Sequence, residues 1–433
     1  MRRKPLPVQP LLIGAASLVN VVVAVLFQWV LLIILGPGKD TDALFAALTL
    51  PQLFSTVIAS ALTQVLVPLL AGESEDDARR TAWSYVALFG PLFAMAAAAL
   101  ALAAPWWVPL LVDGFDAAAK ARAITLTQIS VIGIVFTGTI AVQQAAAFAR
   151  GHYIWPDMAQ ALTNAIALGL LIILLPRFGI MAAAWITLGR LALQCVLMAK
   201  TLGAFVRPDF ADPALAAGWK RMKPLVLGAS YYKLDPVIDR YLLSALAPGS
   251  LSLFTLAQQL HSAASQVVTK ALATPAQTQL AAQAKRGEHD AFARVLKRGF
   301  FITTLFCLAC IIGLALIGEP VLNVLMAYGR FDAEHAHNLW LILLAASGVF
   351  ILGASSSLLA GAFYARGDTR TPTLLGSASF TASLVLKLLM FRAMGILGLA
   401  LAVTFQYVLS AALMAFWLQR HGAIDWVHKK EDA

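Results

Sequence analysis

Long apolar stretches alternate with short polar segments along almost the whole chain. Each apolar stretch has about 18 residues or more, enough for a helix to cross roughly 30 Å of hydrocarbon. Spanning strands would need segments of about ten residues with alternating polarity, and the sequence shows no such pattern. The pattern therefore predicts membrane-spanning helices. Twelve spans are expected, at residues 11–35, 42–71, 82–112, 122–149, 157–175, 179–203, 222–247, 250–281, 295–328, 335–364, 371–391 and 396–419.

The composition agrees with a chain that lies in lipid. Of its 433 residues, 60% are hydrophobic and 12% are charged, whereas roughly 25% are charged in an ordinary soluble domain. The chain opens with the basic run Arg2-Arg3-Lys4, as a signal peptide does, but the following apolar part runs to Leu35 without a small-residue cleavage pattern. We expect this stretch to be retained as the first helix.

The basic residues indicate the orientation. Lysine and arginine number 32 against 22 acids, a net charge of +10, which in a soluble protein would suggest nucleic acid. If the N-terminus is cytoplasmic, 21 of these cations fall on the cytoplasmic side and six on the other. Positive residues collect in cytoplasmic loops. The sequence thus predicts a multi-pass protein of the bacterial inner membrane with both termini in the cytoplasm, membrane lipids around it and no nucleic-acid partner.

An internal repeat divides the chain. Ala149-Arg150-Gly151 recurs 216 positions later as Ala365-Arg366-Gly367. The same offset carries Pro156 onto Pro372, Gly179-Ile180 onto Gly395-Ile396 and Phe115-Asp116 onto Phe331-Asp332, while Leu53 and Pro68 match Leu260 and Pro275 at an offset of 207. Two apolar helices often resemble each other by chance, but an ungapped match over paired loops and helices is uncommon.

Each half holds an even number of spans, so the two copies enter the membrane in the same orientation. Parallel repeats of this kind form the two lobes of transporters that alternate access to a site between them. We predict an all-α integral membrane protein with two parallel six-helix repeats around a central cavity. The expected domains are an N-lobe at 1–205, a cytoplasmic linker at 206–222, a C-lobe at 223–420 and a cytoplasmic tail at 421–433.

The seventh span carries the densest set of charges. Lys233, Asp235, Asp239 and Arg240 lie in eight consecutive positions, with Pro236 between the acids. Charges within spans are costly and are functional candidates by default. Lys233 and Arg240 are candidate anion-binding residues, and Asp235 and Asp239, four apart on one helix face, are candidates for ion coupling. The alternative is an internally satisfied ion-pair cluster that only holds helices together.

Further polar residues lie at membrane depth in other spans. Gln259, Gln266 and Lys270 recur at spacings of seven and four, so they form one stripe of the eighth span. Such a stripe fits a wet cavity wall, or polar contacts between helices. Arg190 and Lys387 are isolated cations expected to snorkel or to pair locally. Asp42, at the start of the second span, is a substrate-binding candidate or an N-cap.

Catalysis is disfavoured by the residues present. The sequence has no phosphate-binding glycine loop, no metal-ligand cluster and no set of nucleophile, base and acid in a soluble domain. The pair Cys307 and Cys310 lies in an apolar stretch, where a redox or metal role would lack exposed thiolates and further ligands. We therefore expect no enzyme activity, no cofactor and no metal.

Several motifs resemble those of the MurJ/MviN lipid II flippases of the multidrug/oligosaccharidyl-lipid/polysaccharide exporter superfamily. The strongest is the segment Phe363 to Pro372, which reads FYARGDTRTP and is similar to the family's F-Y-A-x-x-D-T-x-T-P loop. The segment Thr41-Asp42-Ala43-Leu44 is similar to the family's D-A-F motif, and Asn164 matches a family asparagine in the fifth helix. The resemblance extends over nearly the full length. It makes Arg150, Arg366, Asp368 and Pro372 candidate gating-loop residues and Asn164 a candidate substrate-binding residue.

The resemblance implies alternating-access export of a polyprenyl-diphosphate-linked saccharide, coupled to membrane potential, H+ or Na+. Envelope-biosynthesis proteins are implied as further partners. Family members carry arginines in the first, second and eighth helices that cradle the diphosphate, and the matching positions here are not basic: Val21 and Phe27, Ser55 and Thr56, and Gln259. We hypothesise that Lys233, Arg240 and Lys270 supply replacement cations.

Three functions remain open from the sequence. The first is a flippase that moves a lipid II-like peptidoglycan precursor, or a related envelope glycan, from the cytoplasmic to the periplasmic leaflet. The second is a cation-coupled drug or metabolite exporter of the same superfamily, towards which the missing arginines point. The third is a non-transporting membrane scaffold, which the costly acids Asp235 and Asp239 disfavour.

Overall fold

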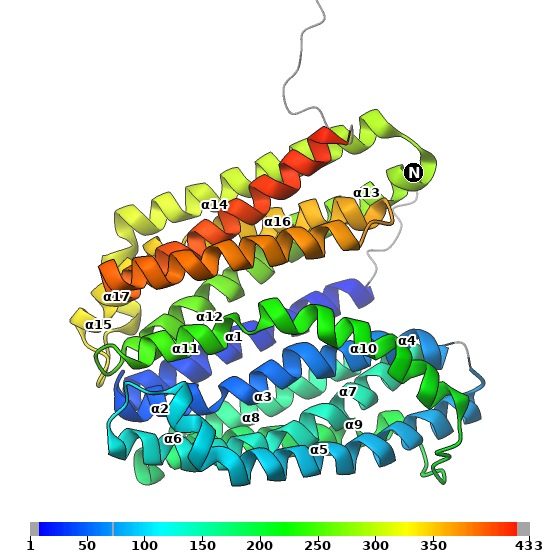
Figure 1. Ribbon diagram of the computed structural model, residues 1–433, viewed down its shortest axis with the longest axis horizontal. Helices are drawn as coiled ribbons and strands as arrows, with labels where there is room; N and C mark the ends of the chain where they lie inside the picture. The colour runs from blue at the N-terminus through cyan, green and yellow to red at the C-terminus, as the bar shows by residue number, and fades with distance from the viewer. Residues whose placement is uncertain (1–7, 72, 422–433) are drawn as a thin grey trace, which may run out of the picture. The chain divides into compact units, whose positions relative to one another are not determined.

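The regular elements of the chain are helices throughout its described part. The computed structural model describes residues 8–71 and 73–421 (Figure 1), so the basic residues at 2–4 and the predicted tail from residue 422 onward lie outside the described residues. Nine helical segments of the described chain are long and apolar enough to cross a membrane. One of them, Arg370–Arg420, bends at Gly395 into two helices, and two further long helical segments, at 213–244 and 250–286, are more polar. The predicted all-α fold with a twelve-helix layout is confirmed.

The first compact unit comprises the described residues up to Ser252, together with Gly329–Phe331. Among its helices, α1 packs against α8, α8 against α9, and α4 and α5 against α7. In chain order they are α1 (Val8–Leu35), α2 (Lys39–Ala47), α3 (Thr49–Phe54), the π-helical turn η1 (Ser55–Ala59), α4 (Ser60–Ala71), α5 (Glu75–Leu111), α6 (Ala117–Val131), α7 (Gly133–Ala149), α8 (Ile154–Phe178), α9 (Ile180–Met198), the 3-10 turn η2 (Ala199–Leu202), α10 (Pro213–Lys233) and α11 (Asp235–Ser244).

The second compact unit comprises Leu253–Tyr328 and the described residues from Asp332 onward. In it α16 packs against α14, α13 and α17. Its helices are α12 (Ser250–Val268, from Leu253 on), the π-helical turn η3 (Thr269–Ala273), α13 (Thr274–Arg286), α14 (His289–Met326), α15 (Ala333–Ala345), α16 (Gly348–Ala365) and α17 (Arg370–Arg420). Figure 1 shows α17 as an orange and a red arm that meet at a bend.

Helix α10 begins inside the segment predicted as a linker. Its first residue is Pro213, and the Asp212 carboxylate accepts the Ala214 backbone N–H at 2.8 Å. An aspartate followed by proline is a frequent helix start, because the carboxylate caps the exposed amides and proline lacks the amide that would go unpaired. Helices α10 and α11 group with the first unit, so the boundary between compact units lies after the predicted linker. The division of the chain into an N-lobe and a C-lobe, which was inferred from the internal repeat, stays a prediction.

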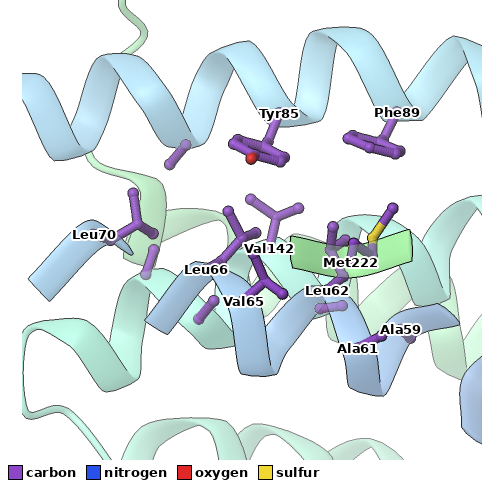
Figure 2. Close-up of a cluster of buried hydrophobic side chains, with 14 of the residues drawn as sticks. Ala59, Ala61, Leu62, Val65, Leu66, Leu70, Tyr85, Phe89, Val142 and Met222 are labelled. Atoms are coloured by element: carbon purple, nitrogen blue, oxygen red, sulfur yellow. The ribbon is translucent and has the colours of Figure 1, made fainter. Parts of the chain in front are cut away.

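The core of the first unit shows why α10 belongs there. Met222, in α10, is 4% exposed and packs in one cluster with Leu62 and Leu66 of α4 and Tyr85 and Phe89 of α5 (Figure 2). The two rings of Tyr85 and Phe89 stack with centroids 5.6 Å apart, and the Tyr85 hydroxyl donates to the Ala214 carbonyl at 3.1 Å. These contacts join α10 to α4 and α5 in one core.

The repeat lies at equivalent helix ends. Gly151 and Gly367, with φ 76° and 78°, end α7 and α16, while Gly179 and Gly395, with φ 60° and 58°, form the tight turns between the last two helices of each half. Glycine enters this left-handed region without the Cβ clash that other residues meet. The repeated residues therefore mark where helices stop and turn.

The offset of 207 for the second helices of the two halves is wrong. The segment α2–α4 begins at Lys39 and ends at Ala71, whereas α12–α13 begins at Ser250 and ends at Arg286, so the offset is 211 at the start and 215 at the end. The segment in the second half is four residues longer. Pro68 lies near the end of α4 and Pro275 near the start of α13, and these prolines are not equivalent.

Asp332 gives a first testable prediction about local stability. Its Oδ1 accepts the His335 backbone N–H at 2.9 Å as the N-cap of α15, and this hydrogen bond lowers the pKa of the carboxyl. A carboxyl with a lowered pKa stabilises the fold above its unfolded value near pH 4, and this contribution disappears as the pH falls through the folded pKa. Replacing Asp332 with alanine should cost about 1 kcal/mol at neutral pH, and thermal unfolding curves measure it.

The variant Asp332→Asn separates the stability contributed by the N-cap hydrogen bond from that contributed by the carboxylate charge. Asparagine caps helices nearly as well as aspartate, so this variant should keep most of the stability at pH 7. The difference between its melting temperature and that of the native chain should be smaller at pH 3 than at pH 7. An equal loss for the alanine and asparagine variants at pH 7 would show that the cap contributes nothing.

Candidate functional site

Asp42 holds the first turn of a helix in the other half of the sequence. Its side chain is 2% exposed. One carboxylate oxygen accepts the Gly249 backbone N–H at 2.7 Å, and the other accepts the Ser252 N–H at 2.8 Å and lies 2.5 Å from the Ser252 hydroxyl. The first backbone amides of a helix have no hydrogen-bond partner within it. A buried carboxylate accepts hydrogen bonds from them, and its negative charge is stabilised by the positive end of the helix dipole. Asp42 thus completes the start of α12, rather than capping its own helix α2, which begins at Lys39.

Close backbone contacts surround Asp42, and we call this set the loop seal: residues 33–42, Gly114, 244–252 and 329–331, all in the first unit. The Arg330 backbone N–H donates to the Ile33 carbonyl at 2.8 Å, and the Gly114 N–H donates to the Ser244 hydroxyl at 3.3 Å. A Cβ at Gly329 would lie 2.5 Å from the Ile33 carbonyl oxygen, and one at Gly249 would lie 3.0 Å from the Pro37 carbonyl. Only glycine permits backbones to approach so closely.

The predicted charge cluster of the seventh span lies at a break in the helix. Helix α10 ends at Lys233 and α11 starts at Asp235. Lys233 and Asp235 are half-buried, whereas Asp239 and Arg240 are 1% and 3% exposed. The charges of both acids act on Arg240, whose Nη1 lies 3.4 Å from the Pro236 carbonyl and whose Nε is buried without a hydrogen-bond partner. The structure brings the four residues together, and their roles in binding and coupling stay predictions.

The predicted stripe of the eighth span is only partly exposed. Gln259 is half-buried, while Gln266 and Lys270 are exposed. His261, on the opposite face of α12, has its Nε2 2.9 Å from the Leu343 carbonyl oxygen, and Gln277 of α13 donates to the Ser357 carbonyl at 2.9 Å. Lys270 lies in the π-helical turn η3, and such turns occur often at functional sites.

A polar chain crosses three helices of the first unit. Asn20 of α1 donates to the Asp157 carbonyl of α8 at 3.1 Å, and Asn164 of α8 donates to the Asn20 side-chain oxygen at 3.1 Å. Arg190 of α9 then donates to the Asn164 side-chain oxygen at 3.0 Å. Sequence reasoning selected Asn164 and expected Arg190 either to snorkel or to pair locally, and of these two the structure shows a hydrogen bond to Asn164. Sequence reasoning missed Asp157, whose contact through a backbone carbonyl leaves no signal in the residue pattern.

The four residues of the repeated loop motif lie at helix ends. Arg150 donates from Nη1 to the Thr201 carbonyl at 2.9 Å and so binds the end of α7 to η2. Arg366 is exposed, and Pro372 is buried in the first turn of α17. Asp368 accepts the side-chain hydroxyl of Thr371 and the backbone amides of Arg370 and Thr371, and these hydrogen bonds lower the pKa of its carboxyl. These contacts fix the loops, and a gating role for the four residues stays a prediction.

Between residues 8 and 421, with residue 72 left aside, no three histidines, cysteines, aspartates or glutamates lie together in a way that could bind a metal ion. The candidate site consists of hydrogen-bonding and charged groups: the loop seal, the polar chain and the charges at the break between α10 and α11.

The comparison with known families decides the class of protein. A family model described as "Lipid II flippase MurJ" matches residues 31–430, which include the loop seal, the charges at the break between α10 and α11 and, of the polar chain, Asp157, Asn164 and Arg190. The chain belongs to the lipid II flippase MurJ family. A "Probable lipid II flippase MurJ" of Vibrio cholerae is 24% identical over 442 residues, covering 97% of this chain and 84% of that protein. A "Lipid II flippase MurJ" of Burkholderia cenocepacia is 23% identical over 406 residues, covering 89% and 78%.

Solved structures agree on the fold. A structure described as "Lipid II flippase MurJ, inward closed conformation" matches with a TM-score of 0.83 and 17% identity, over 94% of this chain and 87% of that one. An inward-facing multidrug resistance MATE family transporter of the MOP superfamily matches with a TM-score of 0.72 and 15% identity, over 94% of each chain. As a MurJ family member with nine apolar helices in its described part, the chain is a multi-pass protein of the bacterial inner membrane.

Proposed function

We propose that this chain is an alternating-access flippase that moves a polyprenyl-diphosphate-linked saccharide, lipid II or a related envelope glycan, from the cytoplasmic to the periplasmic leaflet. The observation that carries the proposal is the match of the MurJ family model to both halves of the chain. The buried charged groups in the first unit support it, because such groups are retained in spans where they bind a polar ligand or an ion. The proposed role is transport and not catalysis.

The substrate headgroup needs cations at membrane depth, and this chain places them differently from the family pattern. Lys233 is half-buried beside the break between α10 and α11, and Lys270 is exposed on η3. Lysine and arginine bind phosphate oxygens by charge-assisted hydrogen bonds. In the proposed mechanism each of these two lysines is a candidate contact for the diphosphate.

Energy coupling is part of the proposal. Asp239 is 1% exposed and lies near Arg240 and Asp235, so a change in its protonation or its cation contacts would alter a set of closely spaced charges. The proposed driving force is the membrane potential or a gradient of H+ or Na+, with both termini in the cytoplasm. Envelope-biosynthesis proteins are proposed as partners that deliver or use the lipid-linked glycan.

Reconstitution into vesicles tests the proposal. Fluorescent lipid II, a second undecaprenyl-linked glycan and a cationic drug are offered in separate arms, and translocation is followed under imposed proton, sodium and voltage gradients. We expect translocation of a lipid-linked glycan and none of the drug. Transport of the drug alone would replace the flippase by an exporter, and no transport in any arm would support a scaffold.

Matched lysine variants test the headgroup contacts in the same assay. Lys270→Gln and Lys233→Gln together should lower the translocation rate by about tenfold or more, since each lost charge-assisted hydrogen bond is worth about 1.5 kcal/mol or more. Lys285→Gln, which changes an exposed lysine in the last turn of α13, should leave the rate unchanged. Equal rates for the double variant and the control would remove these lysines from the site.

A further inference from the structure

Arg190 is a cation placed in the middle of a membrane-spanning segment. The segment runs from Ile180 to Leu202, so Arg190 lies ten residues from one end and twelve from the other. At 1.5 Å per residue, either end is about 15 Å or more away. This distance exceeds the reach of an arginine side chain, and snorkelling does not bring the guanidinium to the membrane surface.

The guanidinium has donors left after its contact with Asn164. Only Nη1 is bonded there, at 3.0 Å, and Arg190 forms no ion pair with any residue of the described chain. Arg190 is half-buried, and none of its other guanidinium nitrogens is a buried atom without a hydrogen-bond partner. Asn164 in turn is held by Asn20. The guanidinium is thus fixed in place by a neutral partner, and its charge is not neutralised.

An apolar groove starts at Arg190. It runs between α8 and α9 in the first unit and has a volume of about 550 Å³. Its walls are mainly aliphatic and aromatic, and Arg190 is the one charged residue that lines it. The lining includes Ile166, Leu170, Leu174, Phe178, Trp185 and Leu193. Phe178 and Trp185 are 64% and 57% exposed, so the groove is open along its side.

We propose that Arg190 and this groove form a second site for a polyprenyl-diphosphate lipid, separate from Lys233 and Lys270, with the diphosphate on the guanidinium and the first isoprene units between α8 and α9. The inference deepens the proposed flippase function and rests on it. A guanidinium offers paired N–H donors that match phosphate oxygens, and the groove walls match a hydrocarbon chain. The depth of Arg190 selects the occupant, because a bilayer phospholipid keeps its headgroup at the interface while a transported headgroup passes mid-membrane.

Binding measured by native mass spectrometry on the full chain in detergent tests the assignment. The probes are undecaprenyl diphosphate, undecaprenol, inorganic diphosphate and phosphatidylglycerol. We expect the native chain to bind undecaprenyl diphosphate in preference to the other three, and Arg190→Gln to weaken this binding by about tenfold or more, as loss of a charge-assisted contact predicts. Arg190→Lys should bind at an intermediate level, because lysine keeps the charge and loses the paired donors.

Two further variants separate binding from folding. Arg177→Gln changes an exposed arginine near the end of α8 and should bind like the native chain. Asn164→Asp places a carboxylate next to Arg190 and neutralises it within a pair, so the fold should remain stable while undecaprenyl diphosphate binding falls. Leu170→Trp should weaken binding of undecaprenyl diphosphate more than that of a short-chain analogue, since it narrows the groove.

The outcomes distinguish this inference from the proposed function. If the native chain binds undecaprenyl diphosphate and Arg190→Gln and Asn164→Asp bind it equally well, the site is elsewhere and the flippase proposal stands. If phosphatidylglycerol competes on equal terms, the groove is a bilayer lipid site and the inference is overturned. If the native chain binds no diphosphate lipid, the proposed function itself fails.

Discussion

Replacing Asp42 with alanine is expected to lower the free energy of unfolding by about 4 kcal/mol. The carboxylate is 2% exposed and accepts the amides of Gly249 and Ser252. Hydrogen bonds to a charged group are worth about 1.5–3 kcal/mol each, and buried amides left without a partner add a desolvation cost. Thermal unfolding in detergent measures the loss, and amide hydrogen exchange at 249–252 should become faster.

The neighbouring aspartate provides the control. Asp40 pairs with Arg122 at 3.0 Å, and the two side chains are 48% and 38% exposed. An exposed pair contributes about 0–1 kcal/mol, so Asp40→Ala should change unfolding little. The loss in free energy of unfolding for Asp42→Asn should lie between those for Asp42→Ala and Asp40→Ala. The asparagine side-chain oxygen accepts one hydrogen bond, while its NH2 group faces the other backbone donor. Unchanged exchange at 249–252 in Asp42→Ala would show that the carboxylate does not hold the first turn of α12.

Replacing Gly398 with alanine should destabilise the second unit strongly. A Cβ at this position would lie 2.0 Å from the Met390 carbonyl oxygen and 2.5 Å from its carbonyl carbon. The obstacle is backbone next to the bend at Gly395, so no flexible side chain can move aside. Forcing atoms into a packed site costs about 1–3 kcal/mol or more, and we expect about 3 kcal/mol in thermal unfolding.

The same helix contains a matched glycine in open space. A Cβ at Gly376 meets no atom within 4 Å, and alanine is favoured over glycine in a helix by about 1 kcal/mol. Gly376→Ala should therefore leave stability unchanged or raise it. If both alanine variants unfold alike, the close approach at Gly398 is relieved by a movement of the turn.

The sequence predicted the helices well because their signals are local. The length of each apolar run in the sequence indicates the length of the helix. The helix ends are marked by residues such as Gly151, Gly179 and Asp116, whose effect depends only on the adjoining turn. The start of α10 had the same kind of signal in Asp212 and Pro213, but the polar composition of the segment led to its interpretation as a linker.

The site was harder to predict because its contacts join distant parts of the chain. Asp42 was selected as a substrate-binding candidate or an N-cap, but its partners lie 207 and 210 positions away, and no local pattern indicates them. Arg190 was expected to snorkel or to pair locally, and the structure shows it bonded to Asn164. The donors that remain, and the groove beside them, depend on how α8 and α9 pack, which residue spacing does not determine.

The bond from Asp42 to the start of α12 has a consequence for how the chain is made. The first half leaves the ribosome before residues 249–252 are synthesised, so the carboxylate that completes the first turn of α12 is present before that turn exists. Protein segments generally fold in the order of synthesis. The later half, produced as a separate polypeptide, would begin its eighth helix with unpaired amides, and co-insertion with residues 1–244 should restore them. The two halves of the chain thus differ in biogenesis, because the first turn of α12 needs a carboxylate that is synthesised earlier.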